Sequence, residues 1–103
     1  MANQIEFDAG AGEDFGDAID WYAKRSPGAA LGFVSEVDLA IEKIAADPER
    51  FAKTYAGCRS CPLKHYPFSV IYYSMPGAPG VYEIIVIAIA HAKRRPGYWR
   101  CRR

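Results

Sequence analysis

The spacing of apolar residues along the 103-residue chain changes from helical to alternating near residue 58. Within Glu13–Arg25 apolar residues stand at positions i, i+3, i+4 and i+7, which predicts an amphipathic helix. Ser26 and Pro27 then supply an N-cap and a proline at the first helical position, and a second helical pattern runs from there to Ala46. Asp47-Pro48 ends this helix, because proline disfavours helical geometry in the residue before it. Two helices joined so tightly are expected to form a hairpin.

Strand patterns stand on either side of this hairpin. At the N-terminus, Ile5 and Phe7 alternate with acidic residues, which predicts a short opening strand. After a connection of undefined shape at 49–57, strand-like segments and the turns between them follow in this order: Cys58–His65, a turn at Tyr66-Pro67, Phe68–Tyr73, a loop at Ser74–Gly80, and Val81–Ala90. The last strand is apolar on both faces, so it should lie centrally in the sheet.

These elements predict one α+β domain over residues 1–103. Its single sheet would contain the short N-terminal strand and a three-stranded antiparallel run, with the helical hairpin packed on one face. The opposite face must then be covered by further core side chains, covered by a partner, or used as a functional groove.

Charge is divided unevenly between the two halves of the chain. Residues 1–50 hold four basic and eleven acidic residues, whereas residues 51–103 hold nine basic residues and one acidic residue. The basic half is expected to attract nucleic acid, an acidic protein surface or an acidic partner segment. The alternative is an internal dipole that affects solubility alone. The chain lacks an apolar run of the ~18–20 residues that span a membrane, and residues 1–4 lack the features of a signal peptide, so we expect a cytoplasmic protein.

The cysteines and glycines do not indicate a cofactor. Cys58, Cys61 and Cys101 are an odd number, so reduced thiols are expected. Cys58 and Cys61 lead into a strand, where residues three apart point to opposite faces. A zinc site would have to recruit Cys101 together with His65 or His91. No glycine motif of the GxGxxG or GK[ST] type is present, and neither a metal nor a nucleotide cofactor is expected.

The last thirteen residues, 91–103, contain six basic residues and no acidic one. Arginine pairs with phosphate or carboxylate through two parallel hydrogen bonds, and aromatic rings can stack on bases. This segment therefore suits a nucleic-acid or acidic-protein surface. Tyr98 and Trp99 could alternatively fold back onto the core.

The two histidines are candidates for acid–base chemistry. His91 ends the last strand, on the parity of Ile87 and Ile89, and an imidazole titrates near neutral pH. His65 shares the parity of Arg59. For both histidines the alternative is an ordinary hydrogen-bonding role.

Several of these segments also occur together, in this order, in a known family. They are Asp20-Trp21-Tyr22-Ala23, Ala40-Ile41-Glu42-Lys43-Ile44, Asp47-Pro48-Glu49-Arg50-Phe51, Tyr66-Pro67-Phe68-Ser69-Val70-Ile71-Tyr72, Ile87-Ala88-Ile89-Ala90-His91 and Arg94-Arg95-Pro96. With this layout the chain resembles toxins of the ParE/RelE superfamily, which belong to type II toxin–antitoxin systems, and its long helical hairpin is closer to the ParE branch. The resemblance implies neutralisation by a cognate, ParD-like antitoxin.

The two branches of this superfamily imply different mechanisms. ParE-like toxins poison DNA gyrase without catalysis of their own, so their basic and aromatic residues would serve binding. The residues that the resemblance assigns to target or antitoxin binding are Arg59, Lys64, Lys93, Arg94, Arg95, Tyr98 and Trp99. RelE-like toxins cleave mRNA on the ribosome, and for that alternative the catalytic candidates are His91, Tyr98 and Arg95. A non-toxic nucleic-acid or protein-binding module is the third hypothesis.

Overall fold

The computed structural model describes residues 3–102. Met1 and Ala2, which entered the signal-peptide argument, and Arg103 of the basic segment lie outside the described residues. The elements, in chain order, are β1 (Gln4–Phe7), α1 (Ala9–Ala23), α2 (Pro27–Ala46), β2 (Ala52–Lys53), the 3-10 turn η1 (Tyr55–Gly57), β3 (Arg59–Pro62), β4 (Phe68–Pro76), β5 (Tyr82–His91) and the 3-10 turn η2 (Arg100–Arg102).

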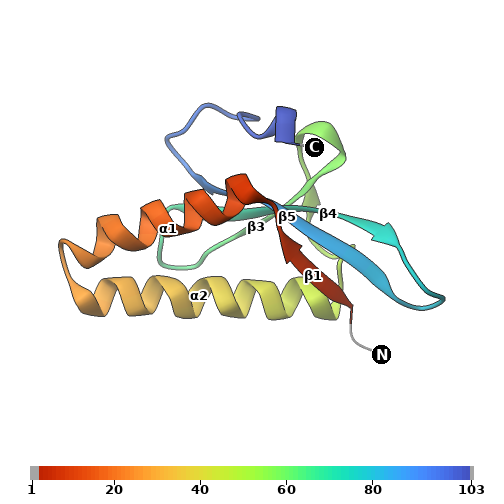
Figure 1. Cartoon of the computed structure of the whole chain (residues 1–103), viewed down its shortest axis with the longest axis horizontal. Coiled ribbons are helices and arrows are strands. Elements are labelled where there is room, and N and C mark those ends of the chain that lie inside the picture. Colours follow the sequence, from red (N-terminus) through yellow and green to blue (C-terminus); the bar gives the residue numbers. More distant parts are fainter. Residues whose placement is uncertain (1–2, 103) are drawn as a thin grey trace.

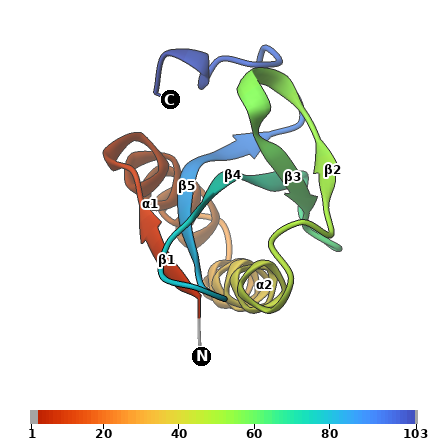
Figure 2. The same cartoon turned by 90° about the vertical axis from the view of Figure 1, so that its right-hand side faces the viewer.

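The strands form one five-stranded sheet in the order β1-β5-β4-β3-β2, with β1 parallel to β5 and the other neighbours antiparallel. The predicted α+β class is confirmed, and β5 lies in the interior of the sheet, between β1 and β4, as expected of a strand that is apolar on both faces. The two helices form the expected hairpin (Figure 1). In the turned view of Figure 2, the C-terminal segment lies on the opposite side of the sheet from α2.

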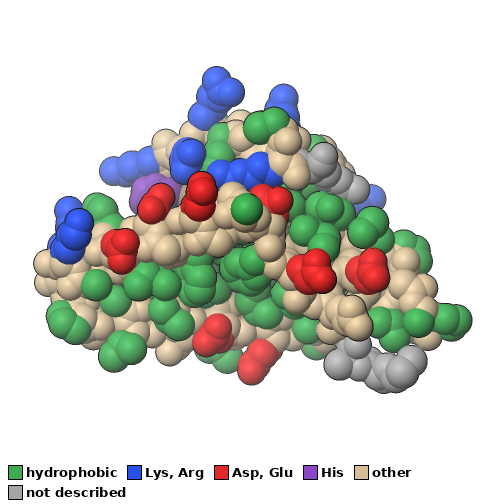
Figure 3. Space-filling model, viewed as in Figure 1, with side chains coloured by type: hydrophobic (Ala, Val, Ile, Leu, Met, Phe, Trp, Pro, Cys, Tyr) green, Lys and Arg blue, Asp and Glu red, His purple; other side chains and the backbone are tan. Residues whose placement is uncertain are grey.

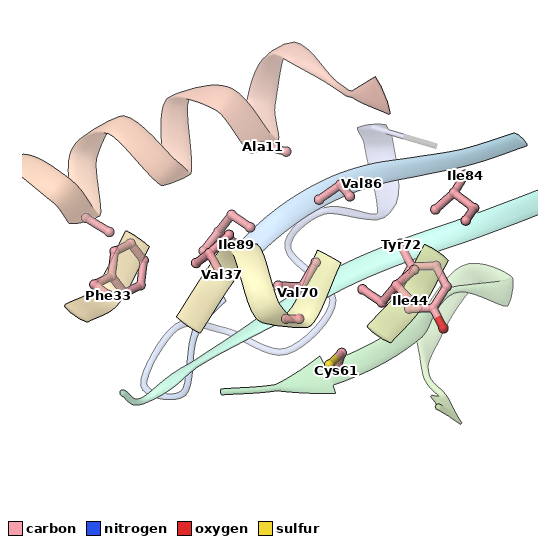
Figure 4. Packing of buried hydrophobic residues seen from close by; sticks show 12 residues of the cluster. Ala11, Phe33, Val37, Ile44, Cys61, Val70, Tyr72, Ile84, Val86 and Ile89 are labelled. Atoms are coloured by element: carbon pink, nitrogen blue, oxygen red, sulfur yellow. The ribbon is translucent and has the colours of Figure 1, made fainter. Parts of the chain in front are cut away.

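The main core lies between the helices and the sheet. Phe33, Val37 and Ile44 of α2 are almost fully buried against β4 and β5 (Figure 4). The Phe33 ring packs within 6 Å of four other aromatic rings, namely Phe15, Tyr22, Tyr66 and Phe68. Burying an aromatic side chain of this size is among the largest single contributions to stability.

A second, smaller core closes the other face of the sheet. It consists of Cys58, Ile71, Ile87, Ala88, Ala90 and Trp99. The chain's own C-terminal segment, through Trp99, therefore covers the face whose cover the sequence left open. Cys58 belongs to this cluster and Cys61 to the main core, so the two thiols lie on opposite faces of the sheet as predicted.

A β-bulge in β5 changes which residues face the helices. Ile71 of β4 pairs with Ala88, whereas the next residue, Tyr72, pairs with Val86, so Ile87 has no partner of its own. Ile87 lies in the smaller core and Ile89 in the main core. The prediction that these two residues share a face is therefore wrong, because a bulge inserts one residue and reverses the alternation beyond it.

Several element boundaries also differ from the predictions. Helix α1 begins at Ala9 rather than Glu13, because the Asp8 carboxylate caps it by accepting the Gly10 N–H at 2.8 Å. Strand β3 is shorter than the predicted segment, and β4 runs on through part of the predicted loop to Pro76. The connection at 49–57 contains β2, which is a fifth strand beyond the predicted four, followed by the 3-10 turn η1. Helix α2 begins at Pro27 as expected, with Ser26 Oγ accepting the Ala29 N–H.

Candidate functional site: the C-terminal basic segment and its carboxylate anchor

A buried carboxylate on α1 holds the C-terminal segment in place. Asp14 is only 8% exposed, and its Oδ2 accepts hydrogen bonds from Tyr98 Oη at 2.9 Å and Arg102 Nη1 at 2.8 Å. The backbone N–H of Ile89 donates to the same oxygen at 3.2 Å. A carboxylate is stable in such a position only when it is paired and hydrogen-bonded. We call the contacts of Asp14 with Tyr98 and Arg102 the C-terminal latch.

Arg102 ties the latch to the bulge in β5. Its Nη1 also donates to the carbonyl oxygen of Ile87 at 2.9 Å. The hydrogen bond to Asp14 raises the pKa of the Arg102 guanidinium. The guanidinium crosses α1 at Gly10, where a Cβ atom would lie 2.5 Å from Arg102 Nε. A glycine at this helical position therefore makes room for the latch.

Tyr98 is a hydrogen-bond donor rather than a proton acceptor at neutral pH. Burial, followed by the hydrogen bond to the Asp14 carboxylate, raises the pKa of Tyr98 to about 12. The Arg94 guanidinium lies 3.9 Å from the centre of the Tyr98 ring and 3.7 Å from Asp14 Oδ1. Tyr98 is thus enclosed between a carboxylate and two guanidinium groups.

Trp99 packs into the protein. Its side chain is 5% exposed and belongs to the smaller core, so in this conformation the ring is not offered to a nucleic-acid base. Its ring lies edge-on to that of Tyr55, and the Arg100 guanidinium in turn sits 4.4 Å from the centre of the Tyr55 ring. Trp99 therefore folds back onto the core, which was the alternative to stacking on bases.

His91 takes part in local contacts at the end of β5. Its ring packs edge-on against Phe68 at 4.8 Å, and its Nδ1 lies 3.0 Å from the backbone nitrogen of Lys93, which donates to it. Across residues 3–102, no hydrogen bond joins His91 to Tyr98 or Arg95. The three catalytic candidates of the nuclease hypothesis are near one another in sequence, and the Tyr98 backbone N–H donates to the Arg95 carbonyl at 3.3 Å. Among the described residues, however, no hydrogen bond joins their side chains.

Arg59 and Lys64 lie apart from the C-terminal segment. Arg59 pairs with Tyr72 across β3 and β4, and directly opposed residues project to the same face, which here is the helix-covered one. Its guanidinium donates to the Phe51 carbonyl at 2.8 Å. The Lys64 backbone N–H donates to Glu36 of α2, which also pairs with His65. The predicted binding residues are therefore divided between two sides of the sheet.

Four exposed basic residues remain on the segment after β5. We call them the basic ridge: Lys93, Arg94, Arg95 and Arg100. Figure 3 shows basic side chains gathered above the acidic side chains that line α1. The ridge presents positive charge to solvent, which suits a phosphate-rich or acidic surface.

Sequence reasoning missed Asp14 and Arg102. The signal for Asp14 was its position: Ala11, Asp14 and Ala18 are the buried residues of α1, spaced i, i+3 and i+7, so an acid stands on the inward face of the helix. Arg102 carried no comparable signal, because it is one of many arginines in a short basic segment.

Within residues 3–102, no group of three His, Cys, Asp or Glu side chains is arranged to hold a metal ion, and none of the three cysteines forms a disulfide bond. None of the described helices combines the length and apolar character needed to cross a membrane.

Comparison with known protein families identifies the class of protein. A sequence profile of the family described as the ParE toxin of type II toxin–antitoxin systems matches residues 5–96. This chain belongs to that family and is a type II toxin, a class whose partner is an antitoxin.

A solved structure shares the fold. The chain is similar to one described as a chromosomal ParDE toxin–antitoxin system from P. aeruginosa, with 20% sequence identity and a TM-score of 0.71. The alignment covers 88% of this chain and 97% of that chain. No curated protein sequence matches. The family match ends at residue 96, before Tyr98 and Arg102 of the latch.

Proposed function

We propose that this toxin binds DNA gyrase through its basic ridge and thereby halts DNA replication, and that a ParD-like antitoxin neutralises it. Membership of the ParE toxin family supports the assignment to the gyrase-directed branch. Under this proposal the protein acts in the cytoplasm through binding energy and needs no chemistry of its own.

The state of Tyr98 is the observation that carries the proposal. A nuclease of this kind needs a base that removes the proton from the RNA 2′-OH. A phenol with a pKa of about 12, already donating its proton to Asp14, is a poor base at neutral pH. Among the described residues, neither the His91 nor the Arg95 side chain is hydrogen-bonded to the Tyr98 hydroxyl. The arrangement therefore favours binding over acid–base catalysis.

The basic ridge supplies the binding surface in this proposal. Its arginines can pair with carboxylates of gyrase or with phosphates of the DNA that gyrase holds. The latch fixes the segment, so less conformational entropy is lost when the ridge meets its target. Binding that depends on exposed cations should weaken as salt concentration rises.

The test compares two syntheses within minutes of inducing the toxin without its antitoxin. Labelled thymidine reports DNA synthesis, and labelled methionine reports protein synthesis. An earlier fall in thymidine incorporation supports gyrase as the target. An earlier fall in methionine incorporation transfers the proposal to the RelE-like endonuclease, and no fall in either while folded protein accumulates favours the non-toxic binding module.

A charge-reversed variant locates the target surface. Arg94→Glu combined with Arg95→Glu should reduce toxicity strongly, because the ridge would then repel an acidic target. Lys53→Glu is the matched control, since Lys53 is exposed on the distant strand β2. Full toxicity of the folded double variant would contradict the assignment of this surface.

A further inference from the structure

The surface above the smaller core is basic and is built from segments without acidic residues. It is formed by η1 and by the segment after β5, which lie side by side (Figure 2). Residues 50–82 and 84–103 contain no Asp or Glu, and all four cations of the basic ridge belong to this surface. The Asp14 carboxylate, which reaches the segment from α1, is buried and already paired with Arg102. Positive charge is therefore presented here without acids interspersed among the cations.

This surface also lacks the apolar centre that is usual in protein interfaces. Among the described residues, the exposed large apolar side chains lie on β1, on the two helices and near the end of β4, and only Tyr55 lies here. Interfaces between proteins commonly have an apolar core, whereas interfaces with nucleic acid are more polar and much more positively charged. The composition of this surface therefore favours a polyanion over an acidic protein.

Two neighbouring groups hold Arg100 in place on this surface. Its guanidinium lies 4.4 Å from the centre of the Tyr55 ring, and a guanidinium stacks favourably on an aromatic face. It also passes close to the turn at Gly97, where φ is 75° and a Cβ atom would lie 2.7 Å from Arg100 Nε. Glycine at this position satisfies both the left-handed backbone and the close approach. Arg100 is thus held ready to pair with an anion.

Turn η1 fixes the ring on which Arg100 stacks. The Cys58 N–H donates to the Tyr55 carbonyl at 3.1 Å, which closes the turn. Within the turn, Ala56 has a φ of 57°, a left-handed conformation that is unfavourable for a residue with a Cβ atom. The Tyr55 ring lies edge-on to the buried Trp99, with 6.3 Å between the ring centres. Tyr55 is therefore a positioning residue for Arg100.

We propose that this surface binds the phosphate backbone of duplex DNA, so that the toxin contacts the DNA that gyrase holds. Lys93, Arg95 and Arg100 pair with phosphates in this proposal. The inference rests on the proposed function, because it takes gyrase-bound DNA as the ligand. Contacts to phosphate carry no sequence information, so binding is independent of DNA sequence. Single-stranded nucleic acid fits less well, because the Trp99 ring is buried and offers its bases no platform for stacking.

The exposed acids of α1 decide from which side the duplex approaches. Glu13 and Asp17 are exposed on this helix, and Asp17 lines the same hollow as Lys93 and Arg94. In Figure 3 the acidic side chains along α1 lie below the basic ones. Because carboxylates repel phosphates, the duplex lies toward η1 and away from α1.

The experiment measures binding of the purified toxin to a short fluorescein-labelled DNA duplex by fluorescence anisotropy, with neither antitoxin nor gyrase present. The dissociation constant at physiological salt should lie between about 1 and 100 μM, as is typical of binding that is independent of sequence. The logarithm of the affinity should fall with the logarithm of the salt concentration, with a slope of about −3 to −4 for the four cations of the ridge. Duplexes of unrelated sequence should bind equally.

Alanine variants of the ridge test which cations make the contacts. Arg95→Ala and Arg100→Ala should each weaken binding by about 3- to 10-fold and reduce the salt slope by about 1. Lys43→Ala is the matched control and should change neither value, since Lys43 is exposed on α2, on the opposite side of the sheet.

Two further variants test the positions of Tyr55 and of α1. Tyr55→Ala should weaken binding about as much as Arg100→Ala, because it releases the guanidinium, whereas Tyr55→Phe keeps the ring and should bind like the wild type. Asp17→Lys should strengthen binding by about 2- to 5-fold, because it replaces a repelling charge. Misfolding cannot produce such a gain, so Asp17→Lys decides the matter if circular dichroism shows that Tyr55→Ala is misfolded.

Several results would overturn the proposal. They are the absence of saturable binding at about 50 mM salt and equal weakening by Lys43→Ala and Arg100→Ala. Binding of poly-glutamate as tight as that of the duplex would transfer the surface to an acidic protein. Tighter binding of a single-stranded RNA of the same length would transfer it to the RelE-like alternative. Equal losses in Tyr55→Phe and Tyr55→Ala would contradict the role of the ring.

The outcomes separate this inference from the gyrase proposal. DNA binding is measured without gyrase, whereas the target is tested by thymidine incorporation in cells. A toxin that halts DNA synthesis but does not bind the duplex would keep gyrase as the target and reject the DNA-binding surface. A toxin that binds the duplex but leaves DNA synthesis intact would reject gyrase and keep the surface.

Discussion

The face of the sheet under the helices and the face under the C-terminal segment, called here the helix-covered and the strap-covered face, are closed by different means. Among the described residues, twelve buried residues form the cluster beneath the helices, whereas six form the one beneath the C-terminal segment. The smaller cluster is supplemented by the latch, in which Arg102 and Tyr98 converge on Asp14. The indole N–H of Trp99 finds no acceptor among the described residues, which adds a cost on this face.

The comparison separates two sources of stability in one small domain. The helix-covered face depends mainly on apolar burial, which needs no ionised side chain and is strengthened by salts that are excluded from the protein surface. The strap-covered face depends on a buried charge that must keep its partners, so removing one partner leaves another uncompensated. Substitutions on the first face should therefore act through volume, and those on the second through charge and pH.

The largest effect is expected from Phe33→Ala. Removing this fully buried ring leaves a cavity among four other aromatic rings and should lower the free energy of unfolding by about 3–5 kcal/mol. Chemical denaturation monitored by circular dichroism measures it. Leu31→Ala, at a side chain 72% exposed on the same helix, should change the value by less than about 0.5 kcal/mol. Similar losses for both variants would contradict the assignment of the main core.

Asp14→Ala should have the next largest effect. It removes the carboxylate to which the Tyr98 hydroxyl and the Arg102 guanidinium both donate, leaves Arg102 with the Ile87 carbonyl, and should cost about 2–4 kcal/mol. The exposed Asp17 on the same helix is the control, and Asp17→Ala should stay within about 0.5 kcal/mol of the wild type. In Arg102→Met, the further loss caused by Asp14→Ala should shrink. Strictly additive losses would show that the two side chains are not coupled.

Alkaline pH should weaken the strap-covered face through Tyr98. Its pKa is about 12 in the fold against an ordinary value of 10.0, so the fold favours the neutral phenol. The contribution is complete below pH 10 and is lost as the pH rises through 12. Between these values the wild type should lose about 1–2 kcal/mol more stability than Tyr98→Phe, allowing for partial exposure. Equal pH profiles of the two proteins in denaturation experiments would argue against the latch.

The same experiment has a counterpart on the helix-covered face. Burial likewise raises the pKa of Tyr72 to about 12, and its hydroxyl donates to the Pro48 carbonyl at 2.7 Å. Tyrosinate absorbance should therefore show late titration of both phenols, with one late group removed in each of Tyr98→Phe and Tyr72→Phe.

The smallest effect contrasts two glycines of α1. Replacing an exposed helical glycine with alanine should stabilise the protein by about 0.5–1 kcal/mol, and Gly16→Ala meets nothing within 4 Å. Gly10→Ala places its Cβ against Arg102 and should lose that gain by displacing the guanidinium. Thermal denaturation of the two variants measures the difference. A gain at Gly10 equal to that at Gly16 would show that Arg102 moves aside without loss.

The sequence predicted those elements whose periodicity is long and uninterrupted. Both ends of helix α2 were predicted correctly, because Ser26-Pro27 supplies the N-cap and first helical residue and Asp47-Pro48 ends the helix. Helix α1 was predicted to begin four residues late, because its first turn contains glycine and small alanines and no large apolar residue. The bulge at Ile87 could not be foreseen, since a run of apolar residues carries no alternation that an inserted residue could disturb.

The candidate site was predicted less completely than the fold. Its general location in the segment after β5 followed from the cluster of basic residues. Arg102 belongs to the latch, and not to the exposed ridge, because it contacts α1. The sequence does not show this contact, since α1 lies far away along the chain. Arg59 was grouped with these residues through the family resemblance, and the sequence does not show on which side of the sheet the C-terminal segment lies.

The sequence separation within the latch has a consequence for the order of folding during synthesis. Asp14 and Arg102 are 88 residues apart, so the ribosome makes Arg102 long after Asp14. The helical hairpin, whose contacts are local, can assemble early, whereas pairing of β1 with β5 and closure of the latch must wait until β5 and the segment after it have been made. Until then, the apolar residues of the strap-covered face remain exposed on the nascent chain, and during that period they are available to chaperones.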